Sequence, residues 1–421
     1  MTVAPLLTAA MIVRDEEAFL ADCLASLRGV VDEVVVVDTG SVDATPDIAR
    51  RAGARVVHHP WRGDFAEARN VSLEHATGRW VLYIDADEQL VGADRAAVEG
   101  LLAEADEVAF RLLLQPRPGT TPYREYRLWR NDPRIRFEGV MHEKVVPAIH
   151  RVGERDGRAI GVCDLLLAHR GYEGDQTAKH RRNLPLLRRQ LRVEPRNLFA
   201  WHHLARVLDG LGDADGAEAA LRQAVEVTRT SGRYDPCGSL SFADLVLRRQ
   251  RRGEDADDLL AEARRAWPGN LVLLWIDART LMARGETTEA LDRLGAMVAV
   301  DPGRLPDLGP SYDERLVGEL PWDAIGLCHF RLGDYRRAAE AYGRAAACAP
   351  GNPAYRAKRD LALARCAGAR RAGARSPRAG AGALREGDGD RHEGAGELRE
   401  GDGAHQGAAA ATARGRQAVP A

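Results

Sequence analysis

The chain has 421 residues, of which 45% are hydrophobic, so it can form two or three domains, each with a core. Its formal net charge of -2 excludes a bulk attraction to nucleic acid or to an anionic membrane surface. The six cysteines are scattered, without a CxxC pair, which is typical of reduced thiols in a cytoplasmic protein.

The first part of the chain alternates between strand and helix patterns. Apolar runs rich in β-branched residues predict strands at residues 7–13, 33–37, 54–58 and 80–84. Apolar residues at helical spacing predict helices at residues 15–28, 45–52 and 64–77. This alternation predicts an α/β fold with a parallel sheet and right-handed crossovers. The apolar start is expected to be a strand and not a signal peptide, and no later run is long enough for a membrane-spanning helix.

Acidic residues follow two of these predicted strands. Asp38 comes after the second strand, and Asp85 and Asp87 come after the fourth. Ligands of open α/β sheets bind at the carboxyl edge of the strands, and two carboxylates there favour a divalent cation between them. The alternative is that these residues cap the helices that follow them. Neither a GxGxxG nor a GxxxxGK[ST] motif is present, so a dinucleotide fold and a P-loop are not supported.

The pattern beyond residue 90 predicts a helix at 96–105 and a strand at 107–114. A polar segment with Glu138, His142 and Glu143 follows, and His169 comes after an apolar run. A lone histidine in such a place is usually a core residue. The basic run at 179–182 opens a helix that either closes over phosphates or exposes a solvated face.

The period changes near residue 190 to uninterrupted helix signals. Small and aromatic residues at 201–224 and 322–350 match the tetratricopeptide spacing, with a partial copy at 285–302 and a degenerate one at 245–263. Irregular inserts are predicted at about 229–238 and 303–320. Such repeats stack into a short superhelix, which either stabilises the first domain or contacts an acceptor, a protein partner or a second copy of the chain. From residue 367 the Arg/Ala/Gly composition predicts a disordered tail.

Four motifs in order make the first domain resemble a known family. They are Met11-Ile-Val-Arg-Asp-Glu-Glu17, Val35-Val-Val-Asp-Thr-Gly-Ser-Val-Asp-Ala-Thr45, Ala68-Arg-Asn70 and Tyr83-Ile-Asp-Ala-Asp-Glu88. This part of the chain, roughly its first 175 residues, resembles the inverting family 2 glycosyltransferases. The resemblance implies the GT-A nucleotide-diphosphosugar fold, a Rossmann-like mixed sheet. Within the family it is most similar to the bacterial branch that carries C-terminal tetratricopeptide repeats.

The resemblance implies a role for each matching position. Asp15, Glu16, Asp38, Asp64, Arg69, Asn70 and Asp85 would bind or shape the site of the nucleotide sugar. Asp87, with Asp85 and His169, would hold the Mn²⁺ or Mg²⁺ that bridges the diphosphate. In this branch Asn is more frequent where Asp15 stands, which blurs base recognition.

Inverting transfer also needs a general base, because one carboxylate must take the proton of the acceptor. In the repeat-bearing branch a Gly-x-x-His-Glu segment lies on the acceptor side. We therefore take Glu143 as the base with His142 beside it as a metal or phosphate contact, and Glu138 as the spare carboxylate. The alternative is that this segment is a strand edge that bonds only locally.

The sequence thus predicts a cytoplasmic, metal-dependent inverting glycosyltransferase. The predicted parts are a GT-A domain at 1–178, tetratricopeptide-like repeats at 179–366 and a disordered tail at 367–421. The acceptor is a saccharide, a lipid-linked glycan or a peptide. The competing hypothesis is a protein-binding scaffold whose transferase domain is degenerate. A sugar nucleotidyltransferase would instead need a glycine-rich basic loop after the first strand, where this chain has Arg14-Asp15-Glu16-Glu17.

Overall fold

The structure is a computed structural model that describes residues 5–139, 143–171, 177–231, 235–307 and 310–374. Within these ranges the chain forms two compact units. The first contains residues 5–273 and 300–314, and the second contains residues 274–299 and 315–374, with the gaps just given. Each unit is described by itself.

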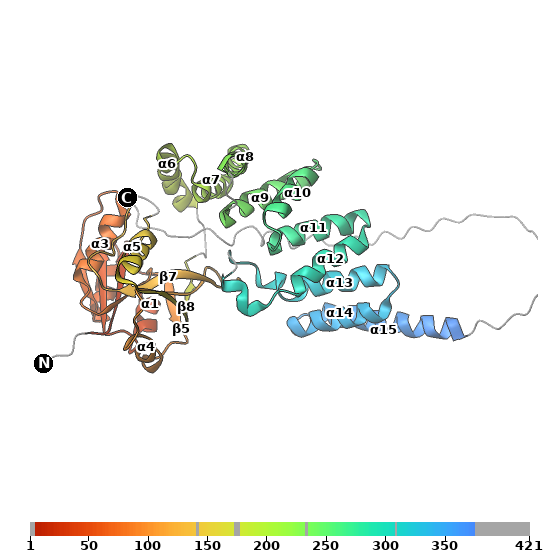
Figure 1. The fold of residues 1–421 in the computed structure, drawn as a ribbon, viewed down its shortest axis with the longest axis horizontal. Coiled ribbons are helices and arrows are strands. Elements are labelled where there is room, and N and C mark those ends of the chain that lie inside the picture. The colour runs from red at the N-terminus through yellow and green to blue at the C-terminus, as the bar shows by residue number, and fades with distance from the viewer. Residues whose placement is uncertain (1–4, 140–142, 172–176, 232–234, 308–309, 375–421) are drawn as a thin grey trace, which may run out of the picture. The chain divides into compact units, whose positions relative to one another are not determined.

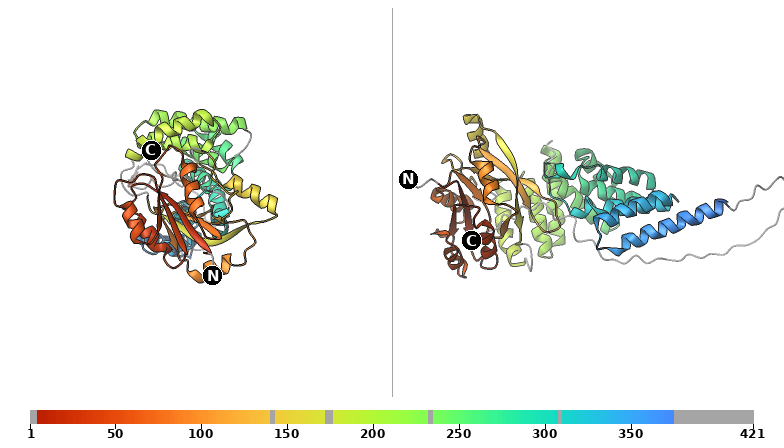
Figure 2. Two further views of the ribbon diagram at one scale, coloured as in Figure 1. Left: turned by 90° about the vertical axis from the view of Figure 1, so that its left-hand side faces the viewer. Right: turned by 90° about the horizontal axis from the view of Figure 1, so that it is seen from below.

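The first unit is built on one sheet, which has eight strands among the described residues (Figures 1 and 2). In chain order the strands are β1 Leu7–Val13, β2 Glu33–Asp38, β3 Arg55–His58, β4 Trp80–Tyr83, β5 Glu88–Val91, β6 Ala109–Gln115, β7 Tyr123–Arg130 and β8 Ile160–His169. Their order across the sheet is β3-β2-β1-β4-β7-β6-β8-β5. The four strands predicted from residues 7–84, which are β1 to β4, are therefore adjacent in the sheet.

The parallel part of the sheet was predicted from its sequence, and the structure confirms it. β1 pairs in parallel with β2 on one side and with β4 on the other. Every residue of β1 is buried, as expected for a central strand that is covered on both faces. β7 then pairs antiparallel to both β4 and β6, so the complete sheet is mixed. The carboxyl ends of β2 and β4 consequently flank the end of β1.

In the described part of the chain five helices connect these strands, and the first four lie close to their predicted ranges. They are α1 Leu20–Leu27, α2 Thr45–Arg51, α3 Phe65–His75, α4 Arg95–Leu102 and α5 Val146–Asp156. The first prediction was wrong at its start, because the helix begins at Leu20 and not at residue 15. Asp15 has a φ of 55°, and the backbone N–H groups of residues 15–17 donate to side chains of the loop at 41–45. Long-range contacts thus hold this segment in a loop.

Three strands and one helix lay outside the predictions. β5, β7, β8 and α5 carry charged residues between apolar ones, which weakens the periodic signal in the sequence. β5 also settles the alternative for the acidic stretch after β4. A strand and not a helix follows Asp87, so neither Asp87 nor Glu88 is a helix cap.

Helical pairs follow the sheet, as the repeat spacing predicted. They are α6 Thr177–Val193, α7 Leu198–Gly210, α8 Ala214–Ser231, α9 Pro236–Arg251, α10 Asp257–Ala266, α11 Leu271–Arg284, α12 Thr287–Val298, α13 Glu319–Arg331, α14 Tyr335–Cys348 and α15 Pro353–Ala374. A Cβ on Gly326 would lie 2.5 Å from the ring of Tyr342, so this glycine lets α13 and α14 pack closely. None of the helices described is long and apolar enough to cross a bilayer.

Two predicted irregular segments differ in the structure. In the segment at 229–238, residues 229–231 belong to α8 and residues 236–238 belong to α9, while residues 232–234 lie outside the described part of the chain. α15 continues past residue 367, where the tail was predicted to begin, and residues 375–421 lie outside the described part of the chain. All six cysteines are free thiols, as the scattered spacing predicted.

The insert at 300–314 belongs to the first unit, although it interrupts the repeats. The Thr121 N–H donates to the Tyr312 carbonyl at 2.7 Å, and the Tyr312 N–H donates to Thr121 Oγ1 at 2.9 Å. Asp307 forms an ion pair with Arg124 of β7 at 3.2 Å. Hydrogen bonds and an ion pair therefore hold the insert against β7 and the residues just before it.

Candidate active site

Asp38 lies at the carboxyl end of β2, where it is buried. Its Oδ1 accepts the N–H of Ser41 at 3.0 Å, and its Oδ2 lies 3.1 Å from Nδ1 of His58 on β3. The parallel register places Asp38 beside Val13 of β1. Asp38 thus faces the edge of the sheet where the sequence predicted nucleotide binding.

The loop after β1 is tied to the loop after β2. Asp15 is exposed, and its Oδ1 accepts the N–H of Val42 at 2.8 Å. Burial raises the pKa of Glu16 to about 8, and the negative charges of Asp87 and Asp85 raise it further. Asp15 therefore shapes the loop, whereas Glu16 belongs to the acidic site.

The acidic stretch after β4 forms a turn that leads into β5. The N–H of Glu88 donates to the carbonyl of Asp85 at 3.0 Å, and the N–H of Asp85 donates to Glu88 Oε2 at 2.9 Å. Both ends of the turn are thus closed by hydrogen bonds. The three carboxylates of the turn, on Asp85, Asp87 and Glu88, are all buried.

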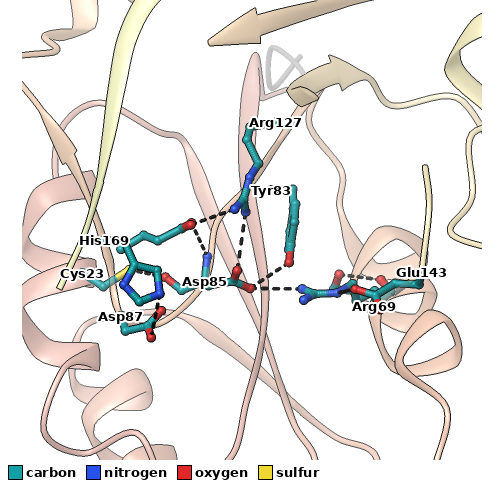
Figure 3. A network of polar contacts seen from close by, with 10 residues as sticks. Cys23, Arg69, Tyr83, Asp85, Asp87, Arg127, Glu143 and His169 are labelled. Carbon is teal, nitrogen blue, oxygen red and sulfur yellow. Dashed lines mark hydrogen bonds and ion pairs between the residues drawn. The ribbon is translucent and has the colours of Figure 1, made fainter. Parts of the chain in front are cut away.

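Asp85 is directed towards two arginines. Its Oδ1 accepts from Arg69 Nη1 at 3.2 Å and from the Tyr83 hydroxyl at 2.8 Å, and its Oδ2 lies 3.6 Å from Arg127 Nη1. Figure 3 shows Arg69 and Arg127 reaching Asp85 from different directions. Both guanidinium carbons also lie close to the Tyr83 ring, at 4.3 Å and 4.5 Å from its centroid. Asp85 is therefore neutralised by the protein itself.

Arg69 connects this turn to the segment that carries Glu143. Arg69 Nε donates to Glu143 Oε1 at 2.6 Å, and both side chains are buried. The neighbouring Asn70 bonds the backbone of Phe137 with both ends of its amide, at 3.0 Å and 2.8 Å. α3 therefore positions the segment before Glu143. Asp64 begins the same helix as its N-cap, since its Oδ1 accepts the N–H of Glu67 at 2.9 Å.

The segment around Glu143 is only partly described. His142 lies outside the described residues. Glu138 is exposed and pairs with Arg151, so the spare carboxylate is on the surface. Glu143 is thus the buried carboxylate of this segment, and its contact with Arg69 shows that it is more than a locally bonded strand edge.

Asp87 faces away from the arginines and towards β8. His169 Nε2 lies 3.2 Å from Asp87 Oδ2, and the two groups lie together on one side of the turn in Figure 3. The N–H of Arg170 donates to the Asp87 carbonyl at 2.8 Å. A Cβ on Gly171 would lie 2.1 Å from Asp87 Oδ2, so only glycine allows this close approach.

The buried groups carry more negative than positive charge, and their pKa values reflect it. Burial raises the pKa of Asp87 to about 7, and the charge of Asp85 adds to this effect. Burial also raises the pKa of Glu88 to about 7, against the lowering effect of Arg127. Burial lowers the pKa of His169, which favours the neutral imidazole that can bind a metal. An added cation would relieve the excess of negative charge.

The three predicted metal ligands do not form one cluster. Among the described residues no group of three or more His, Cys, Asp or Glu side chains is placed to hold a metal ion. The sequence grouped Asp85 with Asp87 and His169, and in the structure the Asp85 carboxylate contacts the two arginines and Tyr83. Asp87 and His169 fit a cation that takes its remaining ligands from a bound diphosphate. Binding through His169 Nε2 places the ring proton on Nδ1, so the contact that Nδ1 accepts from the Gly171 N–H must then lengthen.

Arg127, Tyr83 and Glu88 were not among the predicted site residues. Arg127 Nη2 donates to Glu88 Oε1 at 2.7 Å, and both residues are buried. The strand Tyr123–Arg130 places charged residues between apolar ones, with Glu125 and Arg127 both buried. Glu125 and Arg127 lie at i and i+2 and so face the same side of the sheet, but Arg124 and Arg130 of the same strand are charged as well, so the sequence pattern alone does not single out Arg127.

Parts of the chain match known protein families. The model of the family described as Glycosyl transferase family 2 matches residues 8–140, and tetratricopeptide-repeat models match residues 200–231 and 320–352. A TPR repeat-containing protein of Synechococcus elongatus is 32% identical over 315 residues, which cover 72% of each chain.

Two further relatives are similar over shorter stretches. The SPbeta prophage-derived glycosyltransferase SunS of Bacillus subtilis is 27% identical over 217 residues, covering 49% of this chain and 50% of SunS. The lipopolysaccharide core biosynthesis glycosyltransferase LpsC of Rhizobium meliloti is 36% identical over 176 residues, covering 38% of this chain and 64% of LpsC. The chain thus spans half to two thirds of the length of these two relatives.

Proposed function

Because this chain belongs to glycosyl transferase family 2 and carries tetratricopeptide repeats after its transferase domain, we propose that it is a metal-dependent inverting enzyme. It moves a sugar from a nucleotide-diphosphosugar donor to a saccharide, lipid-linked or peptide acceptor. Asp38 and the turn from Asp85 to Asp87 carry this proposal, because they end two strands that flank β1 at one edge of the sheet.

Asp38 contacts the nucleoside of the donor in this proposal. Its carboxylate is held by the Ser41 N–H and by His58, so it is oriented before the donor arrives. Asp15 contributes by holding the loop at Val42, and Glu16 lines the pocket beside Asp87. Asp64 caps the start of α3, and Asn70 holds the backbone at Phe137.

Asp87 and His169 would hold Mn²⁺ or Mg²⁺, with the donor diphosphate supplying further ligands. When bound, the cation neutralises the charge that develops on the nucleoside diphosphate as it leaves. The support is the 3.2 Å approach of the two side chains and the raised pKa of Asp87. Asp85 supports the turn and keeps Arg69 in place.

Glu143 takes the proton of the acceptor. Inversion requires attack from the face of the sugar opposite the leaving diphosphate, with the proton passing to a carboxylate and no covalent intermediate. The support for Glu143 is its burial and its placement by Arg69 at 2.6 Å.

The repeats contact the acceptor or a protein partner in this proposal. The support is the match of two repeat models and the paired helices that they cover. The family membership and the buried acidic site argue against a scaffold with a degenerate transferase domain.

Asp87→Ala tests the proposal. Thermal shift against a panel of nucleotide sugars first identifies the donor, and transfer is then measured with and without Mn²⁺. Asp87→Ala is expected to lower the rate by at least about 100-fold, since metal stabilisation of the leaving group contributes several kcal/mol. An unchanged rate in Asp87→Ala, or full activity in EDTA, would overturn metal dependence.

Glu143→Gln tests the base. The variant keeps the shape of the side chain and is expected to bind the donor as the wild type does, while transfer falls by about 10²–10⁴-fold. Weakened donor binding together with retained transfer would instead assign Glu143 to holding Arg69.

A further inference from the structure

Arg127 joins the two ends of the turn that presents Asp87. Its Nη2 donates to Glu88 Oε1 at 2.7 Å, and its Nη1 lies 3.6 Å from Asp85 Oδ2. Asp85 and Glu88 are the first and last residues of the turn, and the N–H of Asp85 donates to the other oxygen of Glu88. One guanidinium therefore spans both carboxylates, as Figure 3 shows for Asp85.

The contacts around Arg127 leave it little freedom. It is 3% exposed, and its guanidinium carbon lies 4.5 Å from the centroid of the Tyr83 ring. Tyr83 in turn donates its hydroxyl to Asp85 at 2.8 Å. The strand, the ring and the two carboxylates thus hold the guanidinium in one orientation. A planar guanidinium spans two carboxylates in this way, whereas the ammonium of lysine is a point charge.

Asp87 stands between these two anchored residues. Its carboxylate is aimed at His169, while those of its neighbours are held on the side of the arginines. Without Arg127 both ends of the turn would lose the contacts that tie them to β7, so the turn would be free to shift. The carboxylate of Asp87 would then lose its fixed direction.

We propose that Arg127 is a positioning residue for the cation that the donor requires, because it clamps the turn from Asp85 to Glu88 and so directs Asp87 towards His169. This proposal rests on the proposed metal dependence. Outer contacts that orient a metal ligand typically change metal affinity by about 10–100-fold when they are removed. Arg127 touches neither the cation nor the sugar.

Binding of Mn²⁺ to the full chain, with and without an added nucleoside diphosphate, tests the proposal, and the same mixtures without protein give the baseline. Depletion of the free Mn²⁺ electron paramagnetic resonance signal measures the affinity for wild type, Arg127→Met and Arg127→Lys. Both variants are expected to bind Mn²⁺ at least about tenfold more weakly. Arg130→Lys is the matched control, because Arg130 lies on the same strand and bonds only backbone carbonyls of residues 105 and 107. It should bind as the wild type does.

A second variant separates positioning from charge balance. Arg127→Met leaves Glu88 buried without its partner and can destabilise the fold, whereas Arg127→Met combined with Glu88→Gln leaves neither charge. If Arg127 positions the turn, the double variant regains thermal stability but still binds Mn²⁺ weakly. If Mn²⁺ affinity recovers with stability, or if Arg127→Met binds as tightly as wild type, the proposal is overturned.

The outcome also distinguishes this proposal from the proposed function. Metal dependence itself is contradicted if wild type binds no Mn²⁺ in the presence of the nucleoside diphosphate, or if Asp87→Ala binds Mn²⁺ as tightly as wild type. Binding that depends on Asp87 but not on Arg127 contradicts only the role of Arg127.

Discussion

Arg69 and Glu143 are 74 residues apart in the chain, and a 2.6 Å contact between Nε and Oε1 joins them in the interior. Arg69 also contacts Asp85 at 3.2 Å, so one guanidinium connects the segment of Glu143 to the acidic turn. The acidic turn and the segment that carries Glu143 are therefore both held by the buried side chain of Arg69.

Arg69→Met is expected to destabilise the protein strongly. It leaves Glu143 without the guanidinium and removes one of the cations near Asp85, and breaking a buried ion pair in this way costs about 3–5 kcal/mol. Urea unfolding measures the loss. Arg50→Met is the control, because its pair with Asp47 is exposed on α2 and should contribute no more than about 1 kcal/mol. Equal losses in the two variants would contradict the buried network.

The metal-free protein is expected to become less stable as the pH rises. The pKa of Asp87 is about 7 in the folded chain against an ordinary value of 3.8, so the folded state binds this proton more tightly than the unfolded state. Its contribution to stability is then complete below about pH 4 and is lost as the pH rises through about 7. Glu16 acts in the same direction up to about pH 8.

Melting temperatures in EDTA between about pH 5 and pH 8 measure this loss. Asp87→Asn, which cannot ionise, should flatten the profile, while Asp292→Asn on the exposed side of α12 should leave it unchanged. Mn²⁺ should restore more stability at high pH, because a cation binds the ionised carboxylate. A profile that is the same for wild type and Asp87→Asn would rule out Asp87 as its cause.

Gly171→Ala is expected to weaken Mn²⁺ binding. The added Cβ would meet Asp87 Oδ2 at 2.1 Å, so the carboxylate must turn away from His169. A loss of at least about tenfold in Mn²⁺ affinity is expected, as for other changes that disturb a metal ligand. Gly100→Ala on α4 is the control, because no atom lies near its added Cβ, and alanine favours a helix by about 1 kcal/mol. Wild-type affinity in Gly171→Ala would show that the turn moves freely.

Thr121→Val is expected to loosen the insert at 300–314. The change removes the oxygen that accepts the Tyr312 N–H, and an unsatisfied buried donor costs about 1–3 kcal/mol. Hydrogen exchange of the amides at 310–314 should become faster. Thr230→Val is the control, because its hydroxyl bonds only the carbonyls of its own helix near the surface, so the exchange at 310–314 should stay as in wild type. Unchanged exchange in Thr121→Val would show that other contacts hold the insert.

The sequence by itself determined the parts whose signals are local. The strand periods, the acidic residues that follow β2 and β4, and the repeat spacing are all patterns along the chain, so they can be recognised without knowing which distant segments meet. The four family motifs likewise indicated the fold and placed Asp38 and the acidic turn at one edge of the sheet. The start of α1 was misplaced, because the contacts that hold Asp15 and Glu16 in a loop come from residues 41–45.

The tertiary structure decided which charge pairs with which. Asp85 and Asp87 differ by two positions in a turn, yet one faces two arginines and the other faces His169. Arg69 and Arg127 reach Asp85 from α3 and β7, which lie far apart in the sequence. Burial makes such pairings strong, since a desolvated charge must find its partner wherever the fold brings one. Their partners are therefore set by the packing of the sheet and not by any local pattern.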